Sequence, residues 1–396
     1  MIGNEMKILA FTSIRSDYDL MSTLYRMLND DPEVDFRLLV SGAHLSPEKG
    51  STVKDIRDDG FTILAEVETL ISGDSSASRL KTASNLLGSG LDVVKAYNPD
   101  LIIYAGDRED VLIAAMIGGF LGIPTAHFFA GDHATDGHID NPVRHAASKL
   151  SSMCFCSIPQ HKERLLALGE PEARIFNVGS VAVDKFVQEP GIPFDQVLRR
   201  IGAKAHASSA KAALFIFHPI ADEVAYADEF IRNGVESLID RGFHVFIGSP
   251  NTDPGNFKIE AAIRQLGQLP QVTVYGNLER ALFINLFRGV DLISGNSSAG
   301  ILEAATLRIP AINIGQRQLG RFCADNVIFC DGDRAAIDAA LDQASTEQFQ
   351  AMLASLVNPY GKGDSSRRAY DILKKADLRA LRVKAEDPLQ AGGLNG

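Results

Sequence analysis

The chain has 396 residues, of which 45% are hydrophobic and 22% are charged, and its formal net charge is −11 at pH 7. This length and composition are typical of a folded protein of two or three domains and exclude disorder as the main state. The acidic balance excludes a general nucleic-acid-binding surface, although a local basic pocket for a phosphate stays compatible with it.

The length of the apolar runs and the number of cysteines indicate the cellular compartment that we expect for the protein. No run reaches the roughly 18 apolar residues of a membrane-spanning helix, and the N-terminus does not resemble a secretory signal, so we expect a cytoplasmic protein. Four cysteines are too few for a disulfide framework, and their spacing does not favour zinc. We therefore expect reduced thiols at Cys154, Cys156, Cys323 and Cys330.

The first half of the chain alternates short apolar runs with segments of helical spacing. Strands are predicted at 7–13, 36–42, 100–107, 124–132 and 153–158, and helices at 17–30, 111–122 and 138–152. Asp140 is expected to cap the last of these helices, with Val143, Ala147 and Leu150 on one face.

The second half repeats this order and predicts a second α/β domain. Strand-like runs occur at 213–219, 243–250, 272–277, 291–298 and 310–315. Strands that alternate with helices indicate doubly wound parallel sheets, here two Rossmann-like domains. We expect the N-terminal domain at 1–186, a linker at 187–211, the C-terminal nucleotide-binding domain at 212–365, a helix at about 366–386 that packs back on the first domain, and a flexible tail at 387–396.

Polar residues follow the predicted strands, where open parallel sheets bind ligands. These strand ends are Ser13–Arg15, Gly106–Glu109, Gly131–Asp132, His218 and Gly295–Ser298. If the two sheets face each other, all five converge on one cleft, so we expect a single active site between the domains.

The segment GNSSAGILEA (295–304) is a candidate phosphate site. Its Gly/Ser-rich turn offers backbone N–H groups and the hydroxyls of Ser297 and Ser298, and Glu303 can accept ribose hydroxyls. The alternative is a helix cap followed by a surface glutamate. Arg15 suits a bidentate grip on a phosphate, or else forms a surface salt bridge. The chain lacks GxGxxG and GxxxxGK[ST] motifs, which argues against dinucleotide and P-loop chemistry.

Acids and histidines gather after two first-half strands. Asp107 is either a helix cap or a general base, and Asp140 with Arg144 forms a structural ion pair or a poised carboxylate. His133 and His138 invite a metal-site interpretation, but their spacing is unlike that of helical metal ligands. His218 precedes a proline that keeps it extended, and a structural role is open for it as well.

Taken together, these segments resemble a known family. TSIRSDYDL is similar to its TGTRADYGL, VSGAHLSPEKG to its TGMHLSPEFG, AGDRED to its GDRxE, and HFFAGDHATDGHIDNPVRHAASKLS to its HxHGGExTxGxIDExxRHAxTKLS. NVGSVAVD, FHP, SGNSSAGILEA and NIGQRQLGR follow in the same order. The pattern, over residues 7–325, resembles the hydrolysing UDP-N-acetylglucosamine (UDP-GlcNAc) 2-epimerases of the sialic-acid and legionaminic-acid pathways.

This resemblance implies a GT-B fold with the active site between two Rossmann-like domains. It also implies elimination of UDP to a 2-acetamido glycal followed by addition of water, without metal, nicotinamide or flavin. The catalytic residues it implies are Asp107, Asp132, Asp140, Arg144 and His218. The substrate-binding residues it implies are Arg15, Glu109, His145, Asn251, Asp253, Gly276, Asn296, Ser297, Ser298, Glu303, Arg317 and Arg321.

Two departures from the family pattern concern the sugar. Asp132 replaces a glutamate, and Asn141 replaces an acid. We expect conversion of UDP-GlcNAc to N-acetylmannosamine (ManNAc) and UDP by a homo-oligomeric enzyme. The alternatives are the same reaction on UDP- or GDP-2,4-diacetamido-2,4,6-trideoxyglucose, a non-hydrolysing epimerase, a glycosyltransferase, and a sugar-nucleotide-binding regulator without catalysis.

Overall fold

The computed structural model describes residues 5–72, 75–134, 139–204, 207, 210–218, 220, 223–248, 256–276 and 278–391. The chain divides into two compact units. The first contains the described residues up to 133, those of 139–185 and those from 360 onward, and the second contains 186–359. The division falls inside helix α7 (Val181–Gln188), which runs from one unit into the other.

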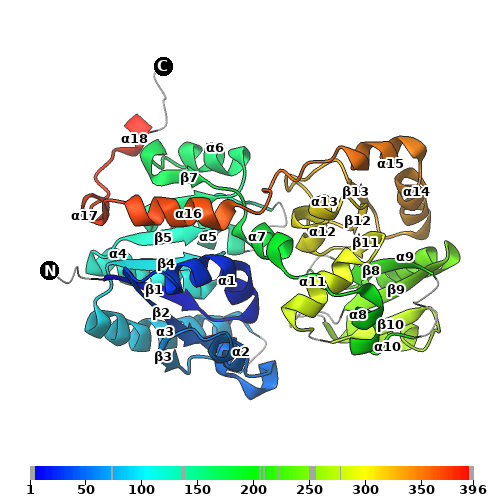
Figure 1. The fold of residues 1–396 in the computed structure, drawn as a ribbon, viewed down its shortest axis with the longest axis horizontal. Helices are drawn as coiled ribbons and strands as arrows, with labels where there is room; N and C mark the ends of the chain where they lie inside the picture. The colour runs from blue at the N-terminus through cyan, green and yellow to red at the C-terminus, as the bar shows by residue number, and fades with distance from the viewer. Residues whose placement is uncertain are drawn as a thin grey trace. The chain divides into compact units, whose positions relative to one another are not determined.

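The first unit is built on a seven-stranded parallel sheet in the order β3-β2-β1-β4-β5-β6-β7 (Figure 1). Its strands are β1 (Met6–Thr12), β2 (Val34–Ser41), β3 (Ile63–Val67), β4 (Leu101–Ala105), β5 (Thr125–Phe128), β6 (Met153–Cys156) and β7 (Ile175–Asn177). The central strands are buried on both sides, as their continuous apolar sequence predicts.

Helices cover both faces of this sheet. One core forms under α1 (Arg15–Asn29), α2 (Val53–Asp58) and α16 (Ser365–Lys375), and another under α3 (Ser76–Tyr97), α4 (Glu109–Leu121) and α5 (Asp140–Leu150). Helix α16 packs against α1, so the end of the chain completes the first unit (Figure 1). Further helices of this unit are α6 (Pro159–Ala167), α17 (Leu378–Leu381) and α18 (Pro388–Ala391).

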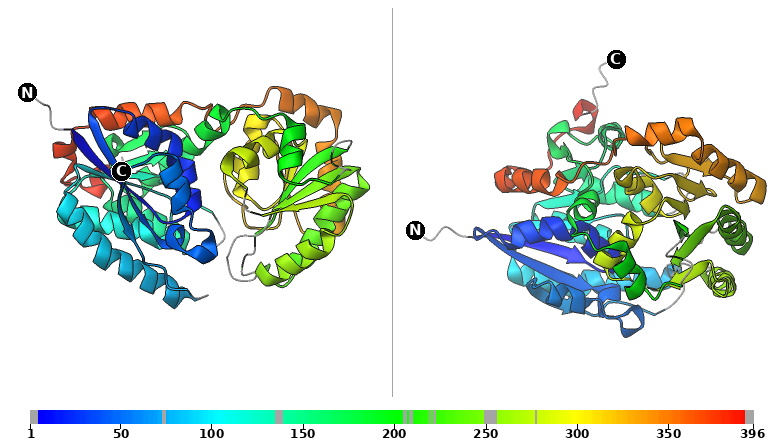
Figure 2. Two further views of the ribbon diagram at one scale, coloured as in Figure 1. Left: turned by 60° about the horizontal axis from the view of Figure 1, so that its bottom comes forward. Right: turned by 45° about the vertical axis from the view of Figure 1, so that its right-hand side comes forward.

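The second unit repeats the architecture with six parallel strands in the order β10-β9-β8-β11-β12-β13. Figure 2 shows this unit, coloured from green through yellow to orange, in two further views. They are β8 (Lys211–Ile216), β9 (Phe243–Gly248), β10 (Val272–Tyr275), β11 (Leu292–Gly295), β12 (Ala311–Ile314) and β13 (Val327–Cys330). One core lies under α9 (Ala227–Asp240), α10 (Asn256–Leu266), α14 (Arg334–Ala344) and α15 (Glu347–Ala354), and the other under α8 (Phe194–Arg200), α11 (Arg280–Arg288), α12 (Ser298–Leu302) and α13 (Ala304–Leu307).

Several boundaries differ from the sequence-based expectations. The described residues of 187–211, expected as a linker, belong to the second unit, because Val197 and Leu198 of α8 are buried in its core. The sequence patterns miss β3, β7 and β13, which are short edge strands whose side chains are mostly half-buried. Within the segment expected as a tail, residues 388–391 form α18.

Helix α5 also starts differently from the prediction. Ile139 is its N-cap, so Asp140 is the first helical residue and does not cap the helix. Leu150, expected on the buried face, is 39% exposed, whereas Asn141 and Arg144 are buried. Helix α5 therefore turns polar as well as apolar side chains toward the unit.

Tight loops at the strand ends depend on glycine at two places. Gly295 ends β11 with φ +113°, and a Cβ atom there would lie 2.1 Å from the carbonyl oxygen of Ile216. Gly131, after β5, has φ +77°, and its Cβ would lie 2.4 Å from the carbonyl oxygen of His161. Any larger side chain would push these two loops off the neighbouring backbone.

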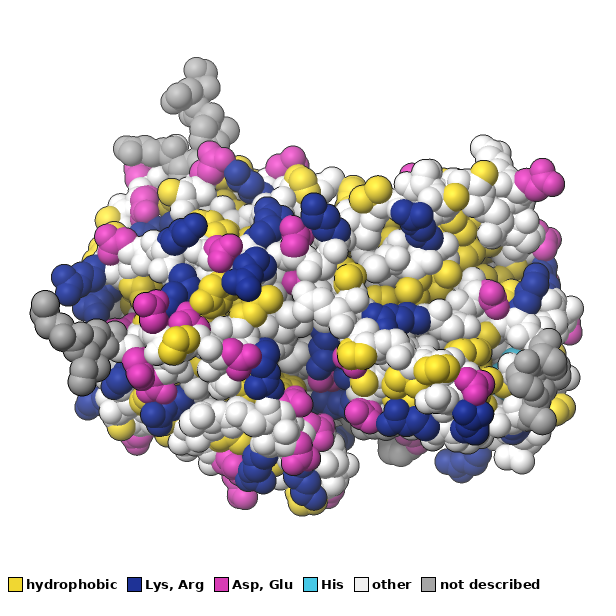
Figure 3. Space-filling model, in the orientation of Figure 1, with side chains coloured by type: hydrophobic (Ala, Val, Ile, Leu, Met, Phe, Trp, Pro, Cys, Tyr) yellow, Lys and Arg dark blue, Asp and Glu magenta, His cyan; other side chains and the backbone are white. Residues whose placement is uncertain are grey.

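Charges of both signs are interspersed on the face shown in Figure 3. Over the part of the chain that the structure describes, no helix combines the length and the apolar character needed to cross a membrane.

Candidate functional site

The first candidate carboxylate, Asp107, follows β4 and is paired with Arg144 of α5. The N-cap of α4 is Arg108, so Asp107 does not serve as the cap that the sequence left open. The Arg144 side chain is 7% exposed and that of Asp107 is 27% exposed. A buried guanidinium therefore holds a partly accessible carboxylate at the carboxyl end of the sheet, which suits proton transfer to a ligand.

The second carboxylate, Asp132, follows the neighbouring strand β5. Its Oδ1 accepts a hydrogen bond from the backbone N–H of His133 at 2.8 Å and lies 3.3 Å from Nε2 of His161. The side chain is 13% exposed. The loop after β5 thus fixes one oxygen of this carboxylate.

The third carboxylate, Asp140, begins α5 and lies 3.4 Å from Arg79 of α3. The same guanidinium donates to Glu109 of α4 through Nε at 3.1 Å and through a terminal nitrogen at 2.6 Å. Burial raises the pKa of Glu109, but Arg79 and Arg108 outweigh it and hold this pKa below its ordinary value. Glu109 is therefore an ionised anchor for Arg79, which links α3, α4 and α5.

His145 of α5 contacts a second histidine, His133, which follows Asp132. Its Nε2 lies 3.1 Å from Nδ1 of His133, and the two rings stack with centroids 5.4 Å apart. Burial, with the neighbouring His133 and Arg144, lowers the pKa of His145 to about 4. Near neutral pH its imidazole is uncharged and can exchange hydrogen bonds without adding positive charge.

Arg15 begins α1 and lies 3.4 Å from Asp19 in an i,i+4 ion pair. The neighbouring Asp17 accepts a hydrogen bond from the backbone N–H of Ser13 at 3.1 Å. Burial, reinforced by Asp110, raises the pKa of Asp17. The ion pair with Asp19 does not rule out phosphate binding by Arg15, because such an i,i+4 pair is weak and its guanidinium can turn to a ligand instead.

In the second unit, His218 and Asn296 join the ends of β8 and β11. The backbone N–H of His218 donates to the Asn296 side chain at 2.7 Å, and the Asn296 amide donates back to the His218 carbonyl at 2.8 Å. Burial, with Arg317 nearby, lowers the pKa of His218 to about 3. A neutral imidazole is thus held at the strand end. The Asn296 side chain is fully buried and serves this junction.

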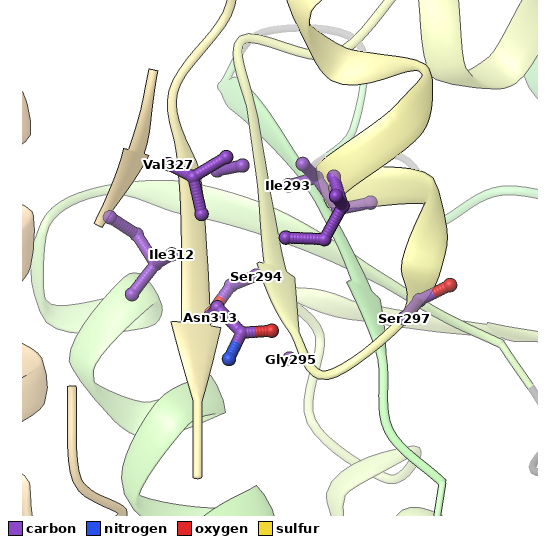
Figure 4. A pocket seen from close by; sticks show the side chains of 10 residues that line it. Ile293, Ser294, Gly295, Ser297, Ile312, Asn313 and Val327 are labelled. Atoms are coloured by element: carbon purple, nitrogen blue, oxygen red, sulfur yellow. The ribbon is translucent and has the colours of Figure 1, made fainter. Parts of the chain in front are cut away.

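The loop after β11 is the predicted phosphate site. The hydroxyl of Ser297 accepts from the backbone N–H of Ala299 at 3.3 Å and caps α12, whose first residue is Ser298. Figure 4 shows Ser297 at this turn, with Ser294 and Asn313 lining a small pocket under the loop. Because α12 has only five residues, the N–H groups and hydroxyls of the loop carry the phosphate hypothesis more than a helix dipole does.

Glu303 is buried and paired with Arg280 of α11 at 2.6 Å. It is therefore not the ordinary surface glutamate that the sequence left as an alternative. Arg280 holds the Glu303 carboxylate in the segment that follows the Gly/Ser-rich turn, where the carboxylate can accept hydrogen bonds from hydroxyl groups.

Of the remaining predicted binding residues, two arginines follow β12, one glycine follows β10, and two residues lie outside the described residues. Arg317 donates to the Asn296 carbonyl at 3.1 Å, and Arg321 donates to the side chain of Gln318 at 2.8 Å. Gly276 follows β10 and faces open space. Asn251 and Asp253, like His138, lie outside the described residues.

Among the residues that contact the predicted site residues, sequence reasoning missed Arg79, His161 and Arg280. His161 follows β6 in the first turn of α6, so the strand-end rule that found the other residues could have found it. Arg79 and Arg280 stand on helices and carry no local signal, because their partners are distant in sequence.

Groups of three or more His, Cys, Asp or Glu side chains placed to bind a metal are absent from the described part of the chain. The four cysteines are free thiols.

The two doubly wound parallel sheets and their polar strand ends place the protein in the GT-B-like class of α/β proteins. Its family follows from comparison with known sequences. The profile of the UDP-N-acetylglucosamine 2-epimerase family matches residues 26–374, and the chain belongs to this enzyme family.

Curated relatives and a solved structure agree with this assignment. The chain is 31% identical, over 94% of its length and 97% of the relative, to the UDP-N,N'-diacetylbacillosamine 2-epimerase (hydrolyzing) of Legionella pneumophila. It is 28% identical, over 88% of its length and 89% of the relative, to the GDP/UDP-N,N'-diacetylbacillosamine 2-epimerase (hydrolyzing) of Campylobacter jejuni. The UDP-GlcNAc 2-epimerase of Neisseria meningitidis, solved with UDP-GlcNAc, shares the fold with a TM-score of 0.81, 18% identity and coverage of 94% of this chain and 100% of that chain.

Proposed function

We propose that the protein is a hydrolysing 2-epimerase of a UDP-linked 2-acetamido sugar. The observation that carries the proposal is the group of three carboxylates, Asp107, Asp132 and Asp140, which the first unit presents after β4, after β5 and at the start of α5. The hydrolysing relatives from Legionella and Campylobacter support the same reaction type.

The reaction has two steps. First, the C1–O bond to UDP breaks and a carboxylate takes the proton from C2, which leaves a glycal with a C1–C2 double bond. Then water adds its oxygen to C1 while C2 receives a proton from the opposite face. The products are UDP and the free sugar with inverted configuration at C2. Both steps need groups that exchange protons near neutral pH, which carboxylates in a partly buried site can do.

The second unit supplies the groups for the departing nucleotide. Ser297 and Ser298 offer hydroxyl and backbone donors to the diphosphate, and Glu303 offers a carboxylate to the ribose hydroxyls. We propose that these groups and the three acids act on the same substrate molecule. Arg15 is proposed as a further phosphate ligand, since a guanidinium forms two parallel hydrogen bonds with a phosphate.

Relatives bear on the choice of sugar. From sequence alone, UDP-GlcNAc is the expected substrate and the 2,4-diacetamido-2,4,6-trideoxy sugar is the alternative. The two relatives named above are called epimerases of N,N'-diacetylbacillosamine, which is that alternative sugar. Because of these two relatives, we propose UDP-N,N'-diacetylbacillosamine as the substrate and keep UDP-GlcNAc as the second candidate.

The test is incubation of the enzyme in D2O with UDP-GlcNAc, with UDP-N,N'-diacetylbacillosamine and with the GDP form of the latter, each followed by proton NMR. We expect release of UDP and a free 2-epimerised sugar carrying deuterium at C2, unchanged by EDTA. Product without deuterium at C2, or a product that keeps its nucleotide, would contradict the hydrolysing mechanism. Preferential consumption of UDP-GlcNAc would contradict the choice of sugar alone.

A further inference from the structure

The imidazole of His161 reaches Asp132 from a different element of the first unit. His161 stands in the first turn of α6, is 4% exposed, and places Nε2 3.3 Å from Oδ1 of Asp132. The backbone N–H of His133 donates to the same oxygen at 2.8 Å. Two nitrogen groups from two elements thus act on a single carboxylate oxygen.

Helix α6 is held firmly against the loop that carries Asp132. Gly131 packs so closely that a Cβ atom would lie 2.4 Å from the His161 carbonyl oxygen. One turn later, Arg164 donates to the Gly131 carbonyl. The ring of Tyr360 meets the His161 ring edge-on, with centroids 6.3 Å apart. These contacts leave the imidazole little freedom to move away from Asp132.

The other ring nitrogen indicates why a histidine stands here. Among the described residues, Nδ1 of His161 has no hydrogen-bond partner although it is buried. A buried polar atom left unpaired costs about 1–3 kcal/mol, so an apolar side chain would pack at this position at lower cost. The contact of Nε2 with Asp132 is the interaction that a histidine adds.

We propose that His161 is a positioning residue that orients the Asp132 carboxylate for proton exchange with the sugar. The inference rests on the proposed function, in which Asp132 is one of the reacting acids. Asp132 is shorter by one methylene than the glutamate of the family pattern, so its oxygens have less reach and their orientation matters more. A donor on Oδ1 restricts rotation of the carboxylate about the Cβ–Cγ bond.

Two amide variants test this role without leaving an apolar hole. In His161→Gln the side-chain nitrogen can occupy the place of Nε2, whereas in His161→Asn it reaches only the place of Nδ1. We expect His161→Gln to keep kcat within about threefold and His161→Asn to lower kcat by about 10- to 100-fold, the scale of a misplaced catalytic group. KM for UDP-N,N'-diacetylbacillosamine should stay the same in both, because binding of the nucleotide does not use this loop.

Lys162→Gln is the matched control, since Lys162 stands next in α6 but pairs with Glu172 at 2.6 Å. Its kcat and KM should equal those of the wild type. Equal kcat in His161→Gln and His161→Asn, or a change in KM alone, would overturn the inference. If the wild type consumes no nucleotide sugar at all, the proposed function fails instead. If the wild type is active and Asp132→Asn is equally active, Asp132 is not a reacting acid and His161 has nothing to position.

Discussion

Asp140 illustrates how one side chain can be either catalytic or structural. It does not cap α5, and its contact with Arg79 is 3.4 Å long and shared with Glu109. A partly exposed ion pair of this kind contributes only about 0–1 kcal/mol to stability. This ion pair by itself therefore contributes little to stability, and the role of Asp140 in proton transfer stays a prediction.

We expect Asp140→Asn to lower turnover by about 10²-fold, the usual scale for a general acid or base, with little change in melting temperature. Steady-state UDP release and thermal unfolding measure the two effects. Glu172→Gln, which neutralises an exposed acid of the same unit, is the control. An Asp140→Asn variant with wild-type turnover and a lowered melting temperature would make Asp140 structural.

In the second unit, Glu303 is the carboxylate whose proposed role in binding can be tested by a single substitution. Glu303→Gln keeps its size but removes the charge that faces Arg280 and the proposed ribose hydroxyls. A hydrogen bond to a charged group contributes roughly 1.5–3 kcal/mol, so the affinity for UDP should fall about tenfold or more. Calorimetry with UDP measures this, with Glu236→Gln on the exposed face of α9 as control. Unchanged affinity for UDP would show that the nucleotide does not bind at Glu303.

At the scale of elements, the end of the chain completes the first unit through a buried arginine. Arg174 is 5% exposed and donates to Glu386 at 2.6 Å, to the Val383 carbonyl at 2.7 Å and to the Ser152 carbonyl at 3.2 Å. One guanidinium thus ties the segment after α17 to the end of the sheet.

Arg174→Ala should lower the free energy of unfolding of the first unit by about 2 kcal/mol or more, because several buried acceptors lose their donor. For a unit of this size, that corresponds to a fall of roughly 5 °C in melting temperature. Differential scanning calorimetry measures the fall, and Arg379→Ala on the exposed side of α17 serves as control. Equal melting of the two variants would show that the segment after α17 does not stabilise the unit.

For the whole molecule, the proposed function requires that both units contact one nucleotide. Hydrogen exchange with mass spectrometry tests this for each unit separately. UDP should slow the exchange of amides in 295–303, and also in 13–18 if Arg15 binds the diphosphate. Uridine, which lacks phosphates, should protect only the second unit. If UDP slows exchange in 295–303 but not in 13–18, Arg15 does not bind the diphosphate and serves as the salt-bridge partner of Asp19.

Stability should also depend on pH through buried histidines. Burial lowers the pKa of His44 and of His127 to about 4, from an ordinary value of 6.5. Between these two pH values the unfolded chain binds protons at these histidines that the folded chain does not. The contribution of the two histidines to folding stability is therefore present above about pH 6.5 and is lost toward pH 4. Burial raises the pKa values of Asp17 and Asp110, so these two carboxyl groups lower the stability of the folded state as the pH rises.

We therefore expect His127→Gln to have a lower melting temperature than the wild type at pH 7.5 but a smaller further loss at pH 5. Nε2 of His127 donates to the Gly106 carbonyl at 2.8 Å and Nδ1 lies 3.0 Å from the Ser148 hydroxyl, and the loss of these contacts explains the first effect. Melting curves at the two pH values measure both. A pH dependence equal to that of the wild type would show that His127 does not contribute to acid unfolding.

The sequence by itself determined the two doubly wound units and the strand ends that carry polar residues, because buried parallel strands need continuous apolar runs and the residues after them must be polar. The family assignment agrees with this prediction. The edge strands β3 and β7 escaped it because they are short and contain the polar residues Glu66 and Asn177. Strand β13, with the sequence VIFC, is an apolar run that the prediction overlooked. The roles of the predicted site residues stay predictions.

Only the tertiary structure decided which charged groups meet. Arg144 pairs with Asp107 across 37 positions of the chain, Arg79 reaches Asp140 across 61, and Arg280 holds Glu303 across 23. No local pattern encodes such pairs, because a guanidinium on a helix has the same sequence signature whether it faces water or a carboxylate. Helix packing against the sheet brings these groups together, and that packing depends on the shape of the whole core.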